Sequence, residues 1–188
     1  MCCFFGKKGK KNNFLKGKMV RKSDSPVLAN YFLKPGYIFL PSRSVVVSTV
    51  LGSSVSVCIY DQKRKAGGMN HFKLPHTRDK QIATPIYGNV ATLALIQMML
   101  DDGSKLKNLE AQIFGGAHNY KMCSQNIGLE NTKIARRILI QKGVPIVSED
   151  VGGGKGRKIV FSTSTNEIGV LRVERLRTSD WYPYEDDR

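Results

Sequence analysis

Alternation of apolar and polar positions predicts most of the strands of this chain. Residues 44–49 are rich in β-branched residues, and after a break at Leu51-Gly52-Ser53 residues 55–60 alternate between larger apolar and smaller side chains. A third strand is expected at 66–74, after a charged turn. Because the connections are short, we expect these three strands to be antiparallel neighbours. Four later segments have strand character: 110–115, 146–150, 158–162 and 170–173.

Two longer apolar segments predict helices. Residues 89–100 leave almost no polar face, which predicts a buried helix with Met98 and Met99 in the core. Residues 127–141 form an amphipathic pattern that ends before Gly143, a residue suited to a left-handed cap. Strands before, between and after two helices predict a layered α/β (α+β) domain of mixed sheet and helices, and not a Rossmann or barrel fold.

The length of 188 residues and a hydrophobic content of 41% fit one domain with a real core. We expect a basic flexible tail over 1–27, the domain over 28–176 and a polar tail over 177–188. No window holds the eighteen or so apolar residues of a membrane span, so no transmembrane segment is expected.

The net charge of +15 is unevenly distributed, because residues 1–22 carry eight Lys or Arg and no acidic residue. Such a tail is typical of a solvated arm, and an arm that touches an anionic membrane surface or nucleic acid is the alternative. Basic residues without interleaved aromatics or a reader motif do not favour nucleic acid as a partner.

The four cysteines, at positions 2, 3, 58 and 123, have no metal-ligand spacing. We therefore expect neither a metal nor a cofactor, and a reducing, cytoplasmic compartment. Cys58 lies in an alternating strand and is expected to pack in the core.

Residues suited to amide hydrolysis lie around the break after the first strand. Ser54 follows Gly52 and Ser53, where small neighbours let a substrate approach and backbone N–H groups can bind an oxyanion. His71 could act as the base, with a hydroxyl of Ser48 or Thr49 fixing its ring. Without further information, a structural serine and a structural histidine remain the alternative interpretation.

Several ordered motifs between residues 31 and 174 resemble the CheD family of chemoreceptor glutamine deamidases. They are Lys34-Pro35-Gly36, Leu51-Gly52-Ser53-x-Val55-Ser56-Val57, Gly67-Gly68-Met69-Asn70-His71-Phe72-x-Leu74-Pro75, Tyr87-Gly88-Asn89, Ile113-Phe114-Gly115-Gly116-Ala117, Ile127-Gly128-x-x-Asn131 and Asp150-Val151-Gly152-Gly153. The resemblance implies a three-layer sandwich similar to glutamine-deamidating bacterial toxins. It also implies conversion of glutamine to glutamate, with release of ammonia, on the cytoplasmic helices of methyl-accepting chemotaxis receptors.

The same resemblance implies roles for individual residues. His71 matches the catalytic histidine, and Ser54 stands where the family has its nucleophilic cysteine. Ser48 matches the third, hydroxyl-bearing position, and Thr49 is the weaker candidate for it. Residues expected to face the substrate are Gly52, Ser53, Asn70 and Thr49.

Serine at the nucleophile position predicts a protein with little or no turnover. A thiol near pKa 8.5 forms a thiolate beside an imidazolium, whereas an alcohol must lose its proton during attack. The alternative function is a non-catalytic docking module that binds receptors or regulates a CheC-type phosphatase, the family's partner. Either function places the chain in the cytoplasm, at the inner face of the membrane through receptors.

A glycine-rich segment at 152–156 lacks the spacing of a phosphate-binding loop and predicts a turn between strands. Lys155 and Arg157 beside it are candidates for contact with acidic receptor helices.

Overall fold

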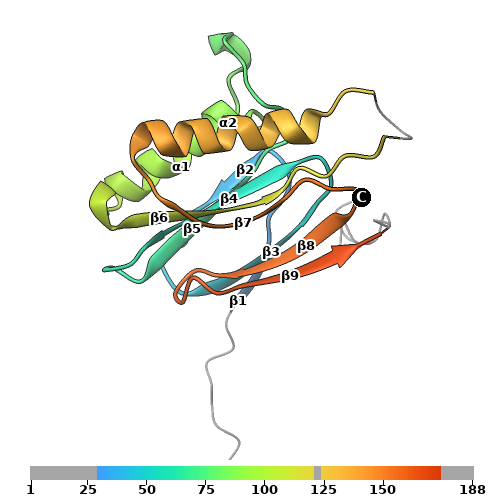
Figure 1. Cartoon of the computed structure of the whole chain (residues 1–188). Coiled ribbons are helices and arrows are strands. Elements are labelled where there is room, and N and C mark those ends of the chain that lie inside the picture. The colour runs from blue at the N-terminus through green and yellow to red at the C-terminus, as the bar shows by residue number, and fades with distance from the viewer. Residues whose placement is uncertain (1–28, 121–123, 175–188) are drawn as a thin grey trace, which may run out of the picture.

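Helices and sheets stack in three layers in the computed structural model, which describes residues 29–120 and 124–174. Figure 1 shows α1 (Gly88–Asp101) and α2 (Ile127–Lys142) lying over one face of a sheet, with a second sheet on its other face. Within the described residues the fold is therefore a mixed α/β arrangement of two helices and two sheets, as the sequence predicts.

The central sheet, between the helices and the other sheet, has five strands. Their order is β2 (Tyr37–Phe39), β5 (Ala66–His71), β4 (Val55–Asp61), β6 (Leu109–Gly115) and β7 (Ile146–Val151). Only the β6–β7 pair is parallel. The outer sheet has the order β1 (Ala29–Phe32), β3 (Val45–Leu51), β8 (Gly156–Ser162) and β9 (Ile168–Val173), with β1 and β3 parallel. Two short 3-10 helices, η1 (Lys80–Ile82) and η2 (Leu106–Asn108), lie before and after α1.

One expected pairing is wrong, because β3 does not lie beside β4. β3 pairs with β1 and β8 in the outer sheet, whereas β4 pairs with β5 and β6 in the central sheet. The break at residues 52–54 carries the chain from one sheet to the other instead of forming a hairpin. The sequence pattern of a strand shows which face is buried but not which strands lie beside it. The change of sheet between β3 and β4 could therefore not be predicted from that pattern.

Apolar side chains fill both spaces between the layers. One cluster joins the helices to the central sheet and includes Val57, Phe72 and Leu95. The other lies between the two sheets and includes Val47 and Phe161. At a rough 25 cal/mol per Å² of apolar surface, each large side chain buried in these clusters contributes about 2 kcal/mol.

Each helix presents one face to the central sheet. In α1, Leu95 and Met99 are fully buried, but Met98 is 38% exposed, so the expectation that both methionines are core residues is wrong for Met98. The helix is apolar all round, yet only one of its faces meets the sheet. In α2 the Asn126 side chain caps the first turn by accepting from the Leu129 N–H, and Gly143 ends the helix with φ +69°.

In the described residues, no helix is both long and apolar enough to cross a membrane. The expected basic tail, residues 1–27, and the expected polar tail, residues 177–188, lie outside the described residues. The expected domain boundaries therefore stay predictions.

Candidate active site

Three side chains form a continuous chain of hydrogen bonds where the two sheets meet. Ser54 Oγ lies 2.9 Å from His71 Nε2, and His71 Nδ1 lies 2.9 Å from Thr49 Oγ1. Thr49 comes from β3 in the outer sheet and His71 from the last position of β5 in the central sheet. Ser54 stands on the segment that links the sheets, so the crossover of the chain creates the site.

The hydrogen bonds of Thr49 determine which ring nitrogen of His71 carries the proton. Thr49 Oγ1 donates its single proton to the Leu33 carbonyl at 2.7 Å. The hydroxyl oxygen can then only accept from the ring, so His71 Nδ1 carries the hydrogen. His71 Nε2 is left with a lone pair that points at the hydroxyl of Ser54, which is the arrangement a general base requires.

Burial keeps the His71 imidazole neutral. The ring is 1% exposed, and burial lowers its pKa from 6.5 to about 4. The Leu33 carbonyl opposes this shift, whereas the positive charge of Lys73 adds to it. Near pH 7 the ring is therefore an uncharged base, but a weak one.

Ser48, the expected third member, does not supply the hydroxyl that meets His71. Alternate residues of a strand face opposite sides, and Val45, Val47, Thr49 and Leu51 of β3 are buried on the side of the central sheet. Ser48 falls on the other side and is half-buried. The structure thus brings the hydroxyl of Thr49, and not that of Ser48, to His71, while the catalytic roles of both residues stay predictions. Counting inward and outward positions along β3 would have identified Thr49 from the sequence.

The segment that carries Ser54 is held in place by backbone contacts to residues after β6. The Gly116 N–H donates to the Ser54 carbonyl, and the Ala117 N–H donates to the Gly52 carbonyl, both at 2.8 Å. Gly115 has φ +107°, and a Cβ there would meet the Ser54 carbonyl oxygen. Only glycine is suited to that conformation and approach, which explains the glycine pair at the end of β6.

Asn131 of α2 ties this segment to the chain after β5. Its side-chain amide donates to the carbonyls of Ser53 and Lys73, at 2.9 and 2.8 Å. Asn131 is fully buried, so its two hydrogen bonds fix the serine segment and the chain after β5 to the inner face of α2. Reasoning from residue chemistry did not single out Asn131, although it lies in one of the motifs that resemble the family.

Asn70, expected to face the substrate, has a fully buried side chain. Its Oδ1 accepts from the Val57 N–H at 2.9 Å, and its carbonyl accepts from the Ser56 hydroxyl. These contacts replace regular ladder bonds between β4 and β5 just before His71. The structure thus places Asn70 as a support for the strand that carries the histidine.

A cavity of about 520 Å³ opens beside Ser54. Ser53, Lys73 and Ile127 are among the residues that line it, and Ser53 is exposed. Gly52 lies behind Ser53 and is half-buried. The Val55 N–H donates to the Phe72 carbonyl and is not available to a ligand. Among the described residues, no turn or loop backbone hydrogen bond is donated by the Ser54 N–H, which makes this group the candidate oxyanion donor.

Cys58 and possible metal ligands are not part of the Ser54–His71–Thr49 site. Cys58 is buried between the sheets as expected, and burial raises the pKa of its thiol far above the usual range. In residues 29–120 and 124–174, no group of three or more His, Cys, Asp or Glu side chains could hold a metal ion.

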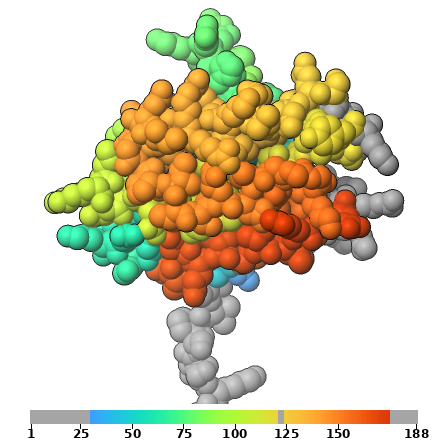
Figure 2. Space-filling model, in the orientation of Figure 1, coloured from blue at the N-terminus to red at the C-terminus, as the bar shows by residue number. Residues whose placement is uncertain are grey.

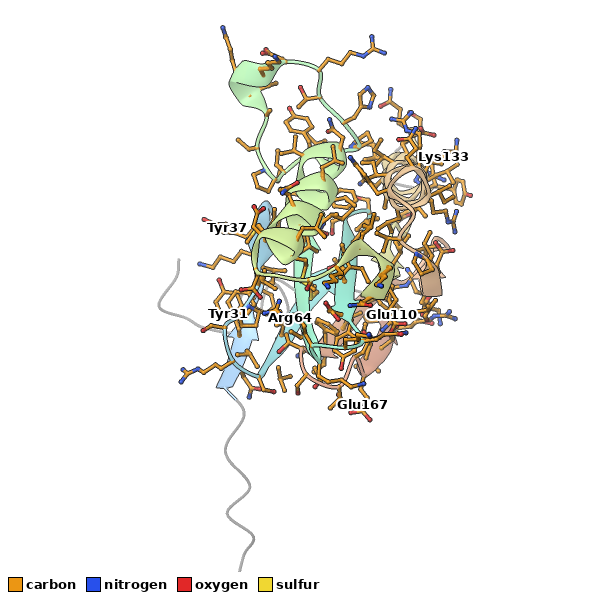
Figure 3. All side chains as sticks on the ribbon, turned by 90° about the vertical axis from the view of Figure 1, so that its left-hand side faces the viewer. Tyr31, Tyr37, Arg64, Glu110, Lys133 and Glu167 are labelled. Carbon is orange, nitrogen blue, oxygen red and sulfur yellow. The ribbon has the colours of Figure 1, made fainter. Side chains whose placement is uncertain are left out.

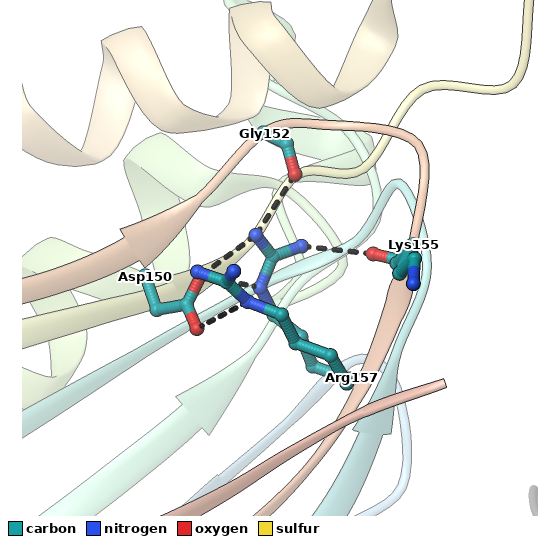
Figure 4. A network of polar contacts seen from close by, with 5 residues as sticks. Asp150, Gly152, Lys155 and Arg157 are labelled. Carbon is teal, nitrogen blue, oxygen red and sulfur yellow. Dashed lines mark hydrogen bonds and ion pairs between the residues drawn. The ribbon is translucent and has the colours of Figure 1, made fainter. Parts of the chain in front are cut away.

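Arg157 is buried and paired, so the expected contact with a receptor helix is wrong for this residue. Its side chain is 4% exposed, and its guanidinium donates to the Asp150 carboxylate and to the carbonyls of Gly152 and Lys155 (Figure 4). Arg157 therefore braces the glycine-rich turn against β7 and β8. The Lys155 ammonium, in contrast, is exposed and pairs with Glu174 at 3.0 Å.

Comparison with known proteins points to one family. The model of the family described as "CheD chemotactic sensory transduction" matches residues 73–172. A probable chemoreceptor glutamine deamidase CheD from Sulfurimonas denitrificans is 36% identical over 147 residues, which is 77% of this chain and 94% of the relative. A protein of the same description from Trichlorobacter lovleyi is 37% identical over 78% of this chain and 92% of its own length. A third, from Rhodospirillum rubrum, is 37% identical over 79% and 85%.

Proposed function

The chain belongs to the CheD family, and from this membership we propose that it is a chemoreceptor glutamine deamidase in which Ser54 replaces the cysteine nucleophile and strongly lowers turnover. The substrate is a glutamine side chain on the cytoplasmic helices of methyl-accepting chemotaxis receptors, which places the protein in the cytoplasm beside the membrane. The chain of hydrogen bonds from Thr49 through His71 to Ser54 is the observation that carries the proposal.

The geometry supports an acyl-transfer reaction in two halves. His71 Nε2 removes the Ser54 proton as Oγ attacks the side-chain carbonyl carbon of the glutamine. The Ser54 N–H stabilises the oxyanion, and the proton passes from His71 to the leaving nitrogen, which departs as ammonia. Water, deprotonated by His71, then attacks the ester. The products are glutamate and the free serine.

Serine slows this reaction because the base that must activate it is weak. An alcohol gives up its proton only during attack, and the pKa of His71 is lowered to about 4. A cysteine thiol is far more acidic than an alcohol and needs less help from the same ring. We therefore expect Ser54→Cys to raise kcat by about 100-fold or more, equivalent to about 3 kcal/mol or more of activation free energy.

The test measures ammonia release, together with conversion of glutamine to glutamate by mass spectrometry, from a receptor cytoplasmic fragment. Three proteins are compared: the chain itself, Ser54→Cys, and Ser54→Cys/His71→Ala. The proposal expects fast turnover from Ser54→Cys alone. Equal turnover by the chain and its cysteine form would contradict the impairment, and turnover that survives His71→Ala would contradict the assigned base.

The second candidate function is a docking module that binds receptors or a CheC-type phosphatase without catalysis. The observation that favours it is the cavity of about 520 Å³ beside Ser54, because a cavity of this size does not need a reactive serine in order to receive a substrate side chain. Binding of receptor fragments with no turnover by Ser54→Cys would favour docking over deamidation.

A further inference from the structure

A second cavity, of about 570 Å³, lies between α2 and the loop that follows β5. Figures 1 and 2 show this loop, which carries η1, standing clear of the helix as a green projection. The residues that line this second cavity include His76, Arg78, Glu130, Lys133 and Arg137. We call this cavity the basic groove.

Positive charge predominates in the basic groove. Lys133 pairs with Glu130 at 2.8 Å, and Figure 3 shows Lys133 at the outer surface of α2. Arg78 and Arg137 are exposed, and neither makes an ion pair within the described residues. The groove is lined by three cations and one carboxylate, so its formal charge is +2 when histidine is counted as neutral. The two arginines carry this uncompensated charge.

The loop side of the groove is held in a fixed shape. Asn89, in the first turn of α1, accepts from the Thr77 N–H and donates to the Thr77 carbonyl, at 3.1 and 2.9 Å. Asp79 accepts from the Gln81 N–H and caps η1. Arg78 therefore follows a residue that is anchored to α1 and precedes a locally capped turn, which lowers the entropy lost when a ligand binds.

The basic groove and the cavity beside Ser54 are lined by neighbouring stretches of the same two segments, although they share no lining residue. Lys73 and Leu74 line the active-site cavity, and the next residues of the chain, from Pro75 on, line the groove. On α2, Ile127 lines the first and Glu130 the second. From Ile127 to Arg137 the helix rises by roughly 15 Å, so one ligand of nearly three helical turns could contact both.

We propose that the basic groove binds acidic side chains of the protein substrate, on the same helix as the target glutamine and roughly seven to eleven residues from it. The inference rests on the proposed function for the identity of the substrate. Its physical basis is the position of the groove next to the active-site cavity, along the chain after β5 and along α2, and the uncompensated charge of Arg78 and Arg137. Arginine suits this role, because its guanidinium binds carboxylates in a bidentate manner.

The experiment measures binding of the complete chain to two helical peptides by fluorescence anisotropy. Both peptides carry one glutamine, and one also carries glutamates seven and eleven residues away, where the other has alanines. The groove variant is Arg78→Glu/Arg137→Glu. The matched control is Lys105→Glu/Lys107→Glu, which reverses two exposed cations near η2 and makes the same change in net charge.

We expect the chain and the control variant to bind the acidic peptide about tenfold more tightly than the neutral one, as two exposed ion pairs would provide. The groove variant should lose this preference, and 0.5 M salt should weaken it in the unmodified chain. Equal binding of both peptides by the chain, or an undiminished preference in the groove variant, would overturn the inference. Loss of binding to phosphatidylserine vesicles in the groove variant, with its peptide preference intact, would also overturn it, in favour of a lipid site.

Turnover of a short glutamine peptide by the Ser54→Cys form separates the two proposals. If the short peptide is deamidated but the acidic preference is missing, the groove inference alone fails. If the acidic preference is present but Ser54→Cys turns over neither peptide, the deamidase proposal fails and the groove stands as a binding surface.

Discussion

Thr49 Oγ1 lies 2.9 Å from His71 Nδ1, although the two residues belong to different sheets. The orientation of the imidazole therefore depends on how the sheets pack against each other. The inter-sheet cluster that includes Val47 and Phe161 fixes this packing, so core residues far from Ser54 contribute to the geometry of the site.

Replacing Thr49 by valine should impair catalysis while keeping the shape of the side chain. In the Ser54→Cys background, we expect kcat to fall by about 10- to 100-fold, because the ring N–H would lose its partner at 2.9 Å and keep only the 3.4 Å contact with the Leu33 carbonyl, at a cost of about 1–3 kcal/mol. The measurement is steady-state ammonia release. Ser48→Ala is the matched control and should leave kcat nearly unchanged, since Ser48 faces away from His71; a larger loss for Ser48→Ala would contradict the assignment.

Burial of neutral His71 predicts a loss of stability on mild acidification. Its pKa is about 4 in the folded chain against 6.5 in the unfolded one, so below pH 6.5 the unfolded state binds the extra proton. The stabilisation is fully present above pH 6.5 and is lost progressively toward pH 4. Between pH 7 and pH 5 we expect the free energy of unfolding to fall by about 2 kcal/mol from this group.

Denaturant unfolding of the chain and of His71→Gln at pH 7 and pH 5 checks this expectation. Glutamine does not titrate, so the variant should show a pH dependence smaller by about 2 kcal/mol. Equal pH dependence in both proteins would show that His71 does not titrate differently in the folded state.

Asn131→Ala should loosen the segment that carries Ser54. The carbonyls of Ser53 and Lys73 would both lose their donor, and we expect the free energy of unfolding to fall by about 2–4 kcal/mol. Asn126→Ala, which removes only the cap of the same helix, should cost about 1 kcal/mol. Hydrogen exchange at residues 52–54 should rise in Asn131→Ala but not in Asn126→Ala.

Loss of the Arg157 partner of Asp150 should lower the free energy of unfolding more than loss of its Arg172 partner. Burial by itself would raise the pKa of Asp150, but hydrogen bonds from Arg172 and Arg157 lower it overall. Arg157 is 4% exposed, so Arg157→Met should cost about 3–5 kcal/mol of unfolding free energy. Arg172 is 63% exposed, and Arg172→Met should have a much smaller effect in the same thermal unfolding measurement.

The sequence predicted individual elements better than their arrangement. The helix at 127–141 follows from periodicity because it packs one regular face against the core, and the strand at 55–60 follows from its alternating residues although both of its faces are buried. The sheet to which 44–49 belongs did not follow, since β1, β8 and the segment at 52–54 decide it over long sequence distances. Met98 was misplaced because an apolar residue on a helix does not show whether a partner covers it.

The candidate site was predictable in part. Ser54 and His71 lie on local motifs, and the structure brings them within hydrogen-bonding distance. Predicting Thr49 as the partner of His71 requires deciding which residues of β3 face inward and which face outward. Asn131 was out of reach of such reasoning, because its two acceptors are backbone carbonyls 78 and 58 residues away in sequence. The resemblance to glutamine-deamidating toxins stays a prediction.

The crossover of the chain between the sheets means that this site cannot be transferred as a linear peptide. A fragment from Leu51 to His71 contains the serine and the histidine but lacks Thr49 of β3, which supplies the hydroxyl that orients the ring. It also lacks α2, whose Asn131 holds the serine segment in place. Grafting the motif onto another scaffold would therefore require two packed sheets and a helix, and the geometry of the site depends on the integrity of all three layers at once.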